Sequence, residues 1–355
     1  MSENSNNSDF APLKRTWNRL RGELGKSVVG QDDLIEQLFI AILAGGHCLV
    51  KGMPGVAKAL VAATFAQALG LSFHRIRCSP DLSPNDVAAD HIPATGNGED
   101  GSPSSRLLAA NVLLVDGVER LPPKTLSLVY QALQDREILA RGELHRLPDP
   151  FLLLASSHPE DEDAAQNPSE LRDDRFMFQI RVDYPSYHDE YQVAETMTAT
   201  PPAPIEPLAS PAEIGSLRKL VRTAGAPAHT LHYVLRLVRS TRVHEGENPD
   251  FVYEWVRNGA GPRAVHFMTQ AAKIRAAING RSNVSIEDIR AVAHPVLRHR
   301  VLTNRNAQST GITVERVIQR LLADVPERVD GDNEPPQAGD TMNPQEWSTG
   351  DTLPW

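Results

Sequence analysis

The chain has 355 residues, more than one ordinary compact domain needs and enough for two domains with terminal tails. A hydrophobic share of 41% can bury a sizeable core, and no uninterrupted apolar run reaches the roughly 18 residues of a transmembrane helix. The net charge of −9 argues against a broad nucleic-acid-binding surface. Cys48 and Cys78 lie in apolar runs, which favours reduced core thiols over a disulfide framework. The N-terminus lacks a secretory signal, so we expect a cytoplasmic protein with no membrane span and no nucleic-acid partner.

Both ends of the chain have the composition of disordered tails, which we expect at residues 1–12 and 326–355. The C-terminal segment holds seven acidic residues against one basic residue, Arg328, and therefore carries most of the net charge. It also contains Trp347 and Trp355, which are unusual in solvent. Two readings stay open: a tail without a selected role, or a docking peptide for a partner.

Residues 47–185 alternate short apolar runs with helical stretches. The runs lack polar alternation, which is typical of strands buried on both faces of a parallel sheet. The candidate strands are 47–52, 72–77, 111–116, 151–156 and 179–183. We therefore expect an α/β domain over residues 13–186.

The strand signals stop after Pro185, and a proline-rich linker at 200–207 is followed by amphipathic helical patterns. Two helices open with capping sequences, at 210–213 and 285–288. This part of the chain, residues 187–325, is predicted to be all-helical.

A glycine-containing loop follows the first strand, at residues 52–59. The phosphate-loop pattern G-x-x-x-x-G-K-[ST] is met by Gly52, by the spacing and by Lys58, whereas Ala57 replaces the second glycine and Ala59 the hydroxyl residue. The backbone N–H groups of such a loop point at phosphates, helped by the N-terminus of the next helix. The strand–loop–helix context favours this interpretation over a chance glycine-rich turn.

A second signal is the apolar strand 112–116, which ends in Asp116. An acid at this place is what a Walker B strand uses to hold Mg²⁺. Alone the pattern is common, but its distance from the loop makes the two signals reinforce each other.

Residues from about Val28 to Pro326 resemble the MoxR-type AAA+ ATPases of the helix-2 insert group. The stretches that carry the resemblance are 28–31, 43–47, 52–58, 79–86, 122–125, 174–176, 261–264 and 295–300. The resemblance implies a P-loop AAA+ core with a parallel five-stranded sheet flanked by helices, and an all-helical C-terminal lid. It also implies ATP or ADP with Mg²⁺ as cofactors, and a ring, hexameric in this family, built from one or several kinds of subunit.

The resemblance also implies the site. The nucleotide would be bound by Val29, Gly30, Gly52, Met53, Pro54, Gly55, Val56, Ala57, Lys58, Ala59 and Leu60. Among the catalytic groups, Asp116 would ligate the metal and His158 would occupy the sensor 1 position. Arg175 matches the arginine finger that reaches a neighbouring subunit, and Arg263 matches sensor 2, which reaches the nucleotide of its own subunit. Without the resemblance, either arginine would be read as a solvated surface charge.

Several positions depart from the family pattern, and they are those that act on Mg²⁺ and water. Ala59 replaces the hydroxyl ligand, Gly117 the Walker B glutamate, and His158 the usual sensor asparagine. Glu119, two residues beyond Gly117, would substitute only if the strand continued that far. We therefore expect nucleotide binding to be retained, and leave open whether the chain is an ATPase that converts ATP and water to ADP and phosphate.

Two functions follow as hypotheses. One is a ring-forming AAA+ chaperone or remodelling factor for protein clients, working with a von Willebrand factor A-type partner, with weak hydrolysis of its own. The other is a pseudo-ATPase subunit that binds nucleotide and supplies its arginine finger to an active paralogue. Other chemistry lacks support, because the twelve histidines show no metal-ligand spacing and no nucleophile motif is present. The basic stretch 290–305 is expected to serve lid packing or a subunit contact.

Overall fold

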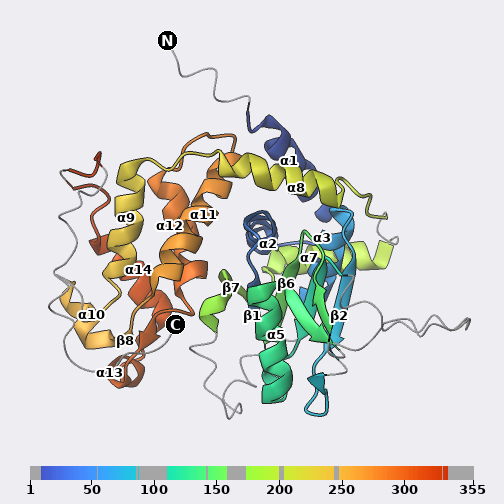
Figure 1. Cartoon of the computed structure of the whole chain (residues 1–355), viewed down its shortest axis with the longest axis horizontal. Coiled ribbons are helices and arrows are strands. Elements are labelled where there is room, and N and C mark those ends of the chain that lie inside the picture. Colours follow the sequence, from blue (N-terminus) through green and yellow to red (C-terminus); the bar gives the residue numbers. More distant parts are fainter. Residues whose placement is uncertain are drawn as a thin grey trace, which may run out of the picture.

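The computed structural model describes residues 9–53, 55–84, 87, 110–140, 143–157, 173–199, 204–243, 248–329 and 331–334. An α/β core and a helical lid lie side by side in Figure 1. In these described ranges no helix has the length and apolarity needed to cross a membrane.

The core is built on one sheet with strand order β2-β3-β6-β1-β7. The strands are β1 (Cys48–Gly52), β2 (Phe73–Arg77), β3 (Val112–Asp116), β6 (Leu152–Ser157) and β7 (Phe178–Val182). Every neighbouring pair is parallel. The predicted parallel five-stranded sheet is thus confirmed, and all five carboxyl ends lie at one edge of it.

Helices cover both faces of this sheet, which explains why its strands read as continuous apolar runs. Alternate residues of β3 face opposite sides: Val112 and Leu114 join one buried cluster, and Leu113 and Val115 join the other. The first cluster includes α1 (Ala11–Leu24), α2 (Asp32–Ala44) and α3 (Lys58–Ala68), and the second includes α5 (Pro123–Asp135). The core also contains an antiparallel hairpin of β4 (Glu137–Ala140) and β5 (Glu143–Arg146), which the sequence analysis did not predict.

The lid consists mainly of helices, as predicted. They are α8 (Pro211–Arg222), α9 (Ala228–Arg239), α10 (Asp250–Trp255), α11 (Pro262–Ile278), α12 (Ile286–Leu297), α13 (Arg305–Ser309) and α14 (Val314–Asp324). Both expected capping boxes are formed, by Ser210 with Glu213 and by Ser285 with Asp288. The lid is not purely helical, because β8 (Val256–Asn258) and β9 (Leu302–Thr303) pair as a short antiparallel ladder.

The domain limits differ in detail from the expected ones. α7 (Tyr187–Ala199), expected in the lid, begins against the core, since a Cβ on Gly30 would meet the Asp189 carboxylate at 2.7 Å. The linker then follows α3, where the Leu208 amide donates to the Ala68 carbonyl at 2.8 Å. The lid therefore begins near residue 210.

Described structure extends into both of the segments that we expected to be tails. Phe10 is buried and α1 starts at Ala11, inside the segment that we expected to be disordered. At the other end Arg236 of α9 binds both carboxylate oxygens of Asp332, at 2.6 and 2.8 Å. This ion pair fixes the start of the acidic segment on the lid. Trp347 and Trp355 lie outside the described residues.

Candidate nucleotide-binding site

A cavity of about 300 Å³ opens at the carboxyl edge of the sheet, between the loop after β1 and the ends of β2 and β3. Its lining residues are Gly55, Val56, Ala57, Lys58, Ala59, Leu60, Arg75 and Asp116. The loop residues lead directly into α3, so the cavity faces a helix N-terminus, where N–H groups and the helix dipole favour an anion. The structure thus brings the predicted phosphate loop and Asp116 to one cavity.

Ala57 replaces the second glycine of the phosphate-loop pattern and still adopts a backbone conformation typical of glycine. Ala57 has φ 60°, the left-handed conformation for which glycine is normally required. Gly52 is needed for another reason, since a Cβ there would collide with the Val182 carbonyl of β7. The loop is therefore held by the sheet on one side and by α3 on the other.

Lys58 is the first residue of α3, and its ammonium group turns back to the loop. Nζ donates to the carbonyls of Gly52 and Met53, the latter at 3.0 Å. Burial lowers the pKa of Lys58, and the charges of Asp116 and Glu119 act in the opposite direction. A partly buried cation with flexible reach is what a phosphate group requires at this place.

Asp116 ends β3, and both of its carboxylate oxygens are engaged. Arg75 of β2 donates to Oδ2 through Nε at 2.9 Å and also through Nη2. Ser156 of β6 donates its hydroxyl to Oδ1. The contacts follow from the register, in which Asp116 lies opposite Ser156, and Arg75 lies two residues from the partner of Asp116 on β2.

The described residues of the cavity fit a Mg²⁺ ion poorly. Mg²⁺ prefers an octahedral shell of oxygen ligands at about 2.0–2.1 Å, with one or two carboxylates. Here Ala59 offers no hydroxyl, and a metal ion would have to displace Arg75 from Asp116, the only carboxylate among the described residues that line the cavity. Asp116 has the expected position, but its environment is that of an ion-paired carboxylate and not of a metal ligand.

Glu119 does not continue the strand that ends at Asp116. β3 ends at Asp116, Gly117 turns the chain with φ 83°, and Glu119 lies in a short 3-10 helix, Val118–Arg120. The extended strand that would have put Glu119 on the same side as residue 117 is therefore not formed. Glu119 is close enough for its charge to raise the pKa of Lys58, but it does not line the cavity.

Arg175 and Arg263 lie together, at the opposite edge of the sheet from the cavity. Arg175 ends the short helix Asp173–Arg175 that leads into the amino end of β7, and it stacks on the Tyr130 ring with Cζ 5.4 Å from the ring centroid. Arg263 comes from the lid and pairs with Asp174 at 3.0 Å. A parallel strand of this length spans about 16 Å, so neither side chain lies at the phosphate loop. We expected Arg263 at the nucleotide of its own subunit; in this structure it pairs with Asp174, the residue before Arg175.

The lid is fixed to this edge by two residues that follow α12, His299 and Arg300. Arg300 is buried and donates to the Asp174 carboxylate at 2.8 Å and to the carbonyls of Asp174, Phe176 and Met177 at 2.7, 2.5 and 3.3 Å. Burial lowers the pKa of Arg300 to about 10, and Asp174 partly offsets this. His299 binds the Phe176 carbonyl at 3.0 Å. The basic stretch of the sequence therefore serves lid packing.

The remaining expected site residues lie in different places in the structure. Val29 and Gly30 precede α2 and do not line the cavity. Met53 contributes its carbonyl to Lys58. Pro54 and His158 lie outside the described residues. Sequence reasoning missed Arg75 and Ser156. Both lay inside predicted strands, and it is the strand register that brings them to Asp116.

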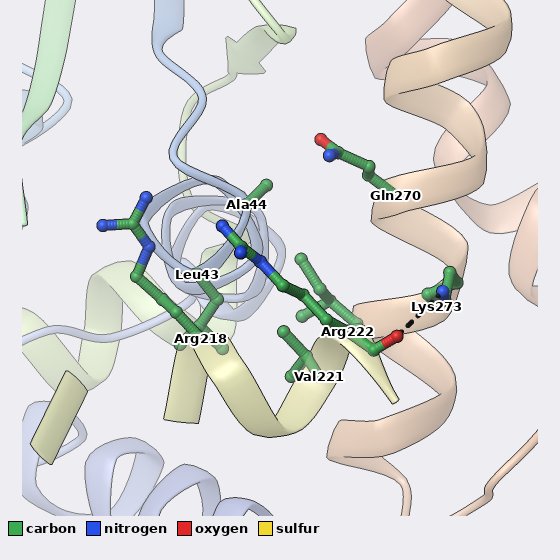
Figure 2. A pocket seen from close by; sticks show the side chains of 8 residues that line it. Leu43, Ala44, Arg218, Val221, Arg222, Gln270 and Lys273 are labelled. Atoms are coloured by element: carbon green, nitrogen blue, oxygen red, sulfur yellow. Dashed lines mark hydrogen bonds between the residues drawn. The ribbon is translucent and has the colours of Figure 1, made fainter. Parts of the chain in front are cut away.

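A second hollow, of about 120 Å³, lies where the lid meets α2. Figure 2 shows Arg222 extending from α8 toward Ala44, while Lys273 donates to the Arg222 carbonyl at 3.2 Å. Arg136 donates to the Gly45 carbonyl at 3.0 Å, so cations gather at the carboxyl end of α2. This hollow contains none of the predicted site residues.

Comparisons with known proteins agree with this arrangement. A family model described as the ATPase family associated with various cellular activities (AAA) matches residues 47–178, and an AAA lid domain model matches residues 254–321. The protein named Chaperone MoxR1 from Mycobacterium tuberculosis is 34% identical over 329 residues, which are 93% of this chain and 86% of that protein. Protein MoxR of Methylorubrum extorquens is 28% identical over 80% of this chain and 86% of its own length.

A solved structure has the same fold. It is that of a candidate ATPase from Cytophaga hutchinsonii, with a TM-score of 0.81 and 28% identity over 90% of this chain and 96% of that one. The matched core, the matched lid and a relative at this identity over nearly the whole length agree with the residues that suggested the resemblance. The chain belongs to the MoxR family of AAA+ ATPases.

Proposed function

We propose that this protein is a nucleotide-binding AAA+ subunit that acts on protein clients as a chaperone or remodelling factor, with weak or no ATP hydrolysis of its own. The observation that carries the proposal is that one cavity keeps the groups that bind phosphates and lacks groups needed for hydrolysis. Lys58 and the loop backbone are arranged for phosphates, whereas Ala59, Gly117 and the ion-paired Asp116 lack the groups that act on metal and water. Binding and hydrolysis therefore separate in this chain.

The energetics support this separation. Phosphoryl transfer depends on positioning and on stabilising charge in the transition state. Removing one well-placed group typically lowers the rate about 10²–10³-fold, and groups that act together are not additive. Binding needs less: the helix N-terminus and the Lys58 charge both remain.

A second candidate function rests on the two arginines at the amino end of β7. Arg175 and Arg263 are far from the cavity of their own subunit, and Arg263 is 51% exposed. In a ring, both would serve the nucleotide of a neighbour. A subunit with an impaired site and intact arginines would then be a pseudo-ATPase that completes the site of an active paralogue.

The wider assignment follows the family. We infer a ring, hexameric by analogy, located in the cytoplasm, with a protein client and a von Willebrand factor A-type partner. The relative from M. tuberculosis is named a chaperone, which supports a protein client here.

Nucleotide titration tests the proposal. Lys58→Ala should abolish binding of ATP by the purified protein, because the phosphates lose the lysine that lines the cavity. Lys219→Ala, which removes the same charge from an exposed position on α8, is the matched control and should bind like wild type. Failure of wild type to bind ATP at millimolar concentration would overturn the proposed function.

A further inference from the structure

Among the described residues that line the cavity, Arg75 and Asp116 are the two that belong neither to the loop nor to α3. Arg75 projects from β2, the edge strand of the sheet, and its side chain is 36% exposed. Within the described residues its hydrogen bonds go to Asp116 alone, through Nε and Nη2. Because a guanidinium group has five N–H donors in a planar fork, its other edge is available to a ligand.

We propose that the Arg75 guanidinium takes the place of a divalent cation in this site, so that the protein binds a nucleoside triphosphate without Mg²⁺. The inference rests on the proposed nucleotide function and concerns how that same site neutralises the phosphates. Arg75 thereby becomes a phosphate ligand.

The charged groups that line the cavity support this role of Arg75. In a metal-dependent loop, the ion lies between the hydroxyl after the lysine, the Walker B acid and the phosphates. Here the hydroxyl is absent at Ala59, and a fixed cation already lies against the acid. Asp116, which itself accepts from the Ser156 hydroxyl, holds the guanidinium in place, as a carboxylate often orients an arginine. Arginine binds phosphate oxygens through two parallel N–H donors, which a point charge does not.

The same contacts explain why a metal ion would compete poorly. To reach Asp116, an ion would have to break the Arg75 pair and lose its own water, without gaining a hydroxyl ligand from residue 59. Displaced from Asp116, the Arg75 charge would stay close to the incoming ion and repel it. Lys58 and Arg75, placed on two sides of the cavity, neutralise the phosphates without this cost.

Calorimetric titration of the full chain with ATP, in excess EDTA and in excess Mg²⁺, tests the proposal. Wild type should bind in EDTA with a Kd within about threefold of the value in Mg²⁺. Arg75→Gln should raise the Kd in EDTA about tenfold or more, the scale of a lost charge-assisted hydrogen bond. Arg77→Gln removes the same charge from the same strand, at an exposed position that does not line the cavity, and should change the Kd less than twofold.

ATP titration of a second variant, Asp116→Asn, tests the proposal even if Arg75→Gln fails to fold. The Asp116→Asn change keeps an oxygen acceptor for Arg75 but removes a negative charge beside the phosphates, so affinity in EDTA should rise. A metal-ligating Asp116 predicts the reverse, a loss of affinity in Mg²⁺. Binding of ATP only in Mg²⁺, unchanged by Arg75→Gln, would overturn this inference and leave the nucleotide function standing. No binding in either buffer would overturn both.

Discussion

Substitution of Arg300 tests whether this side chain joins the lid to the core at the amino end of β7, next to Arg175. Arg300→Met keeps most of the aliphatic volume and removes a guanidinium whose side chain is 1% exposed. The change leaves the carbonyls of Phe176 and Met177 without this donor and takes one cation from Asp174. Breaking a buried ion pair typically costs 3–5 kcal/mol. Because Asp174 keeps Arg263 as a second partner, we expect the lower end, a loss of about 3 kcal/mol in the free energy of unfolding.

Urea unfolding, followed by circular dichroism, measures this loss from the shift in midpoint at constant slope. Arg305→Met, at an exposed position at the start of α13, is the matched control and should change the free energy of unfolding by less than about 0.5 kcal/mol. A loss below about 1 kcal/mol for Arg300→Met would refute the view that this side chain joins lid and core.

Three further predictions follow from the site and the core. Arg175→Ala and Arg263→Ala should each leave the ATP affinity of the monomer unchanged and weaken ATP-promoted assembly; a loss of affinity in titration, with assembly intact by sedimentation, would contradict their placement at the edge of β7. His47 and His299 are buried, and burial lowers the pKa of His47 to about 3 and that of His299 well below its usual value. The unfolded chain therefore binds protons below about pH 6.5 that the folded chain does not, so unfolding at pH 5 should be easier than at pH 7 by about 2 kcal/mol for each histidine; equal urea midpoints at both pH values would exclude this. Gly117→Glu, the change that restores the family residue, should lower the free energy of unfolding by about 1–2 kcal/mol because φ is 83° there, and Gly117→Asn, which tolerates this conformation better, should cost less in the same assay.

The sheet was predictable because the apolar composition of its strands indicates that they are buried on both faces. Apolar runs such as Val112–Val115 require helices on both faces, and that is the arrangement found. The hairpin Glu137–Arg146 was not predictable in the same way, since its short strands mix charged and apolar residues and pair only with each other. The capping boxes marked the starts of α8 and α12 because their signal is local.

The site was predictable only in part, for a related reason. The spacing of Gly52 and Lys58 is a local feature, so the loop could be located from the chain alone. The ion pair of Arg75 with Asp116 joins residues 41 positions apart and depends on strand register. Likewise, Arg263 matches sensor 2 by its local motif, but the packing of the lid on β7 decides which edge of the sheet it reaches.

The central claim, that this chain binds ATP without turning it over efficiently, is tested most directly by a single-turnover measurement. Purified protein in excess over labelled ATP, with Mg²⁺ present, is quenched over time, and the bound nucleotide is separated into ATP and ADP. We predict that ATP stays bound and is converted more slowly than about 0.1 per second, two orders of magnitude below a typical enzyme turnover of about 10 per second. Conversion of the bound ATP to ADP at several per second, abolished by Lys58→Ala, would contradict the account.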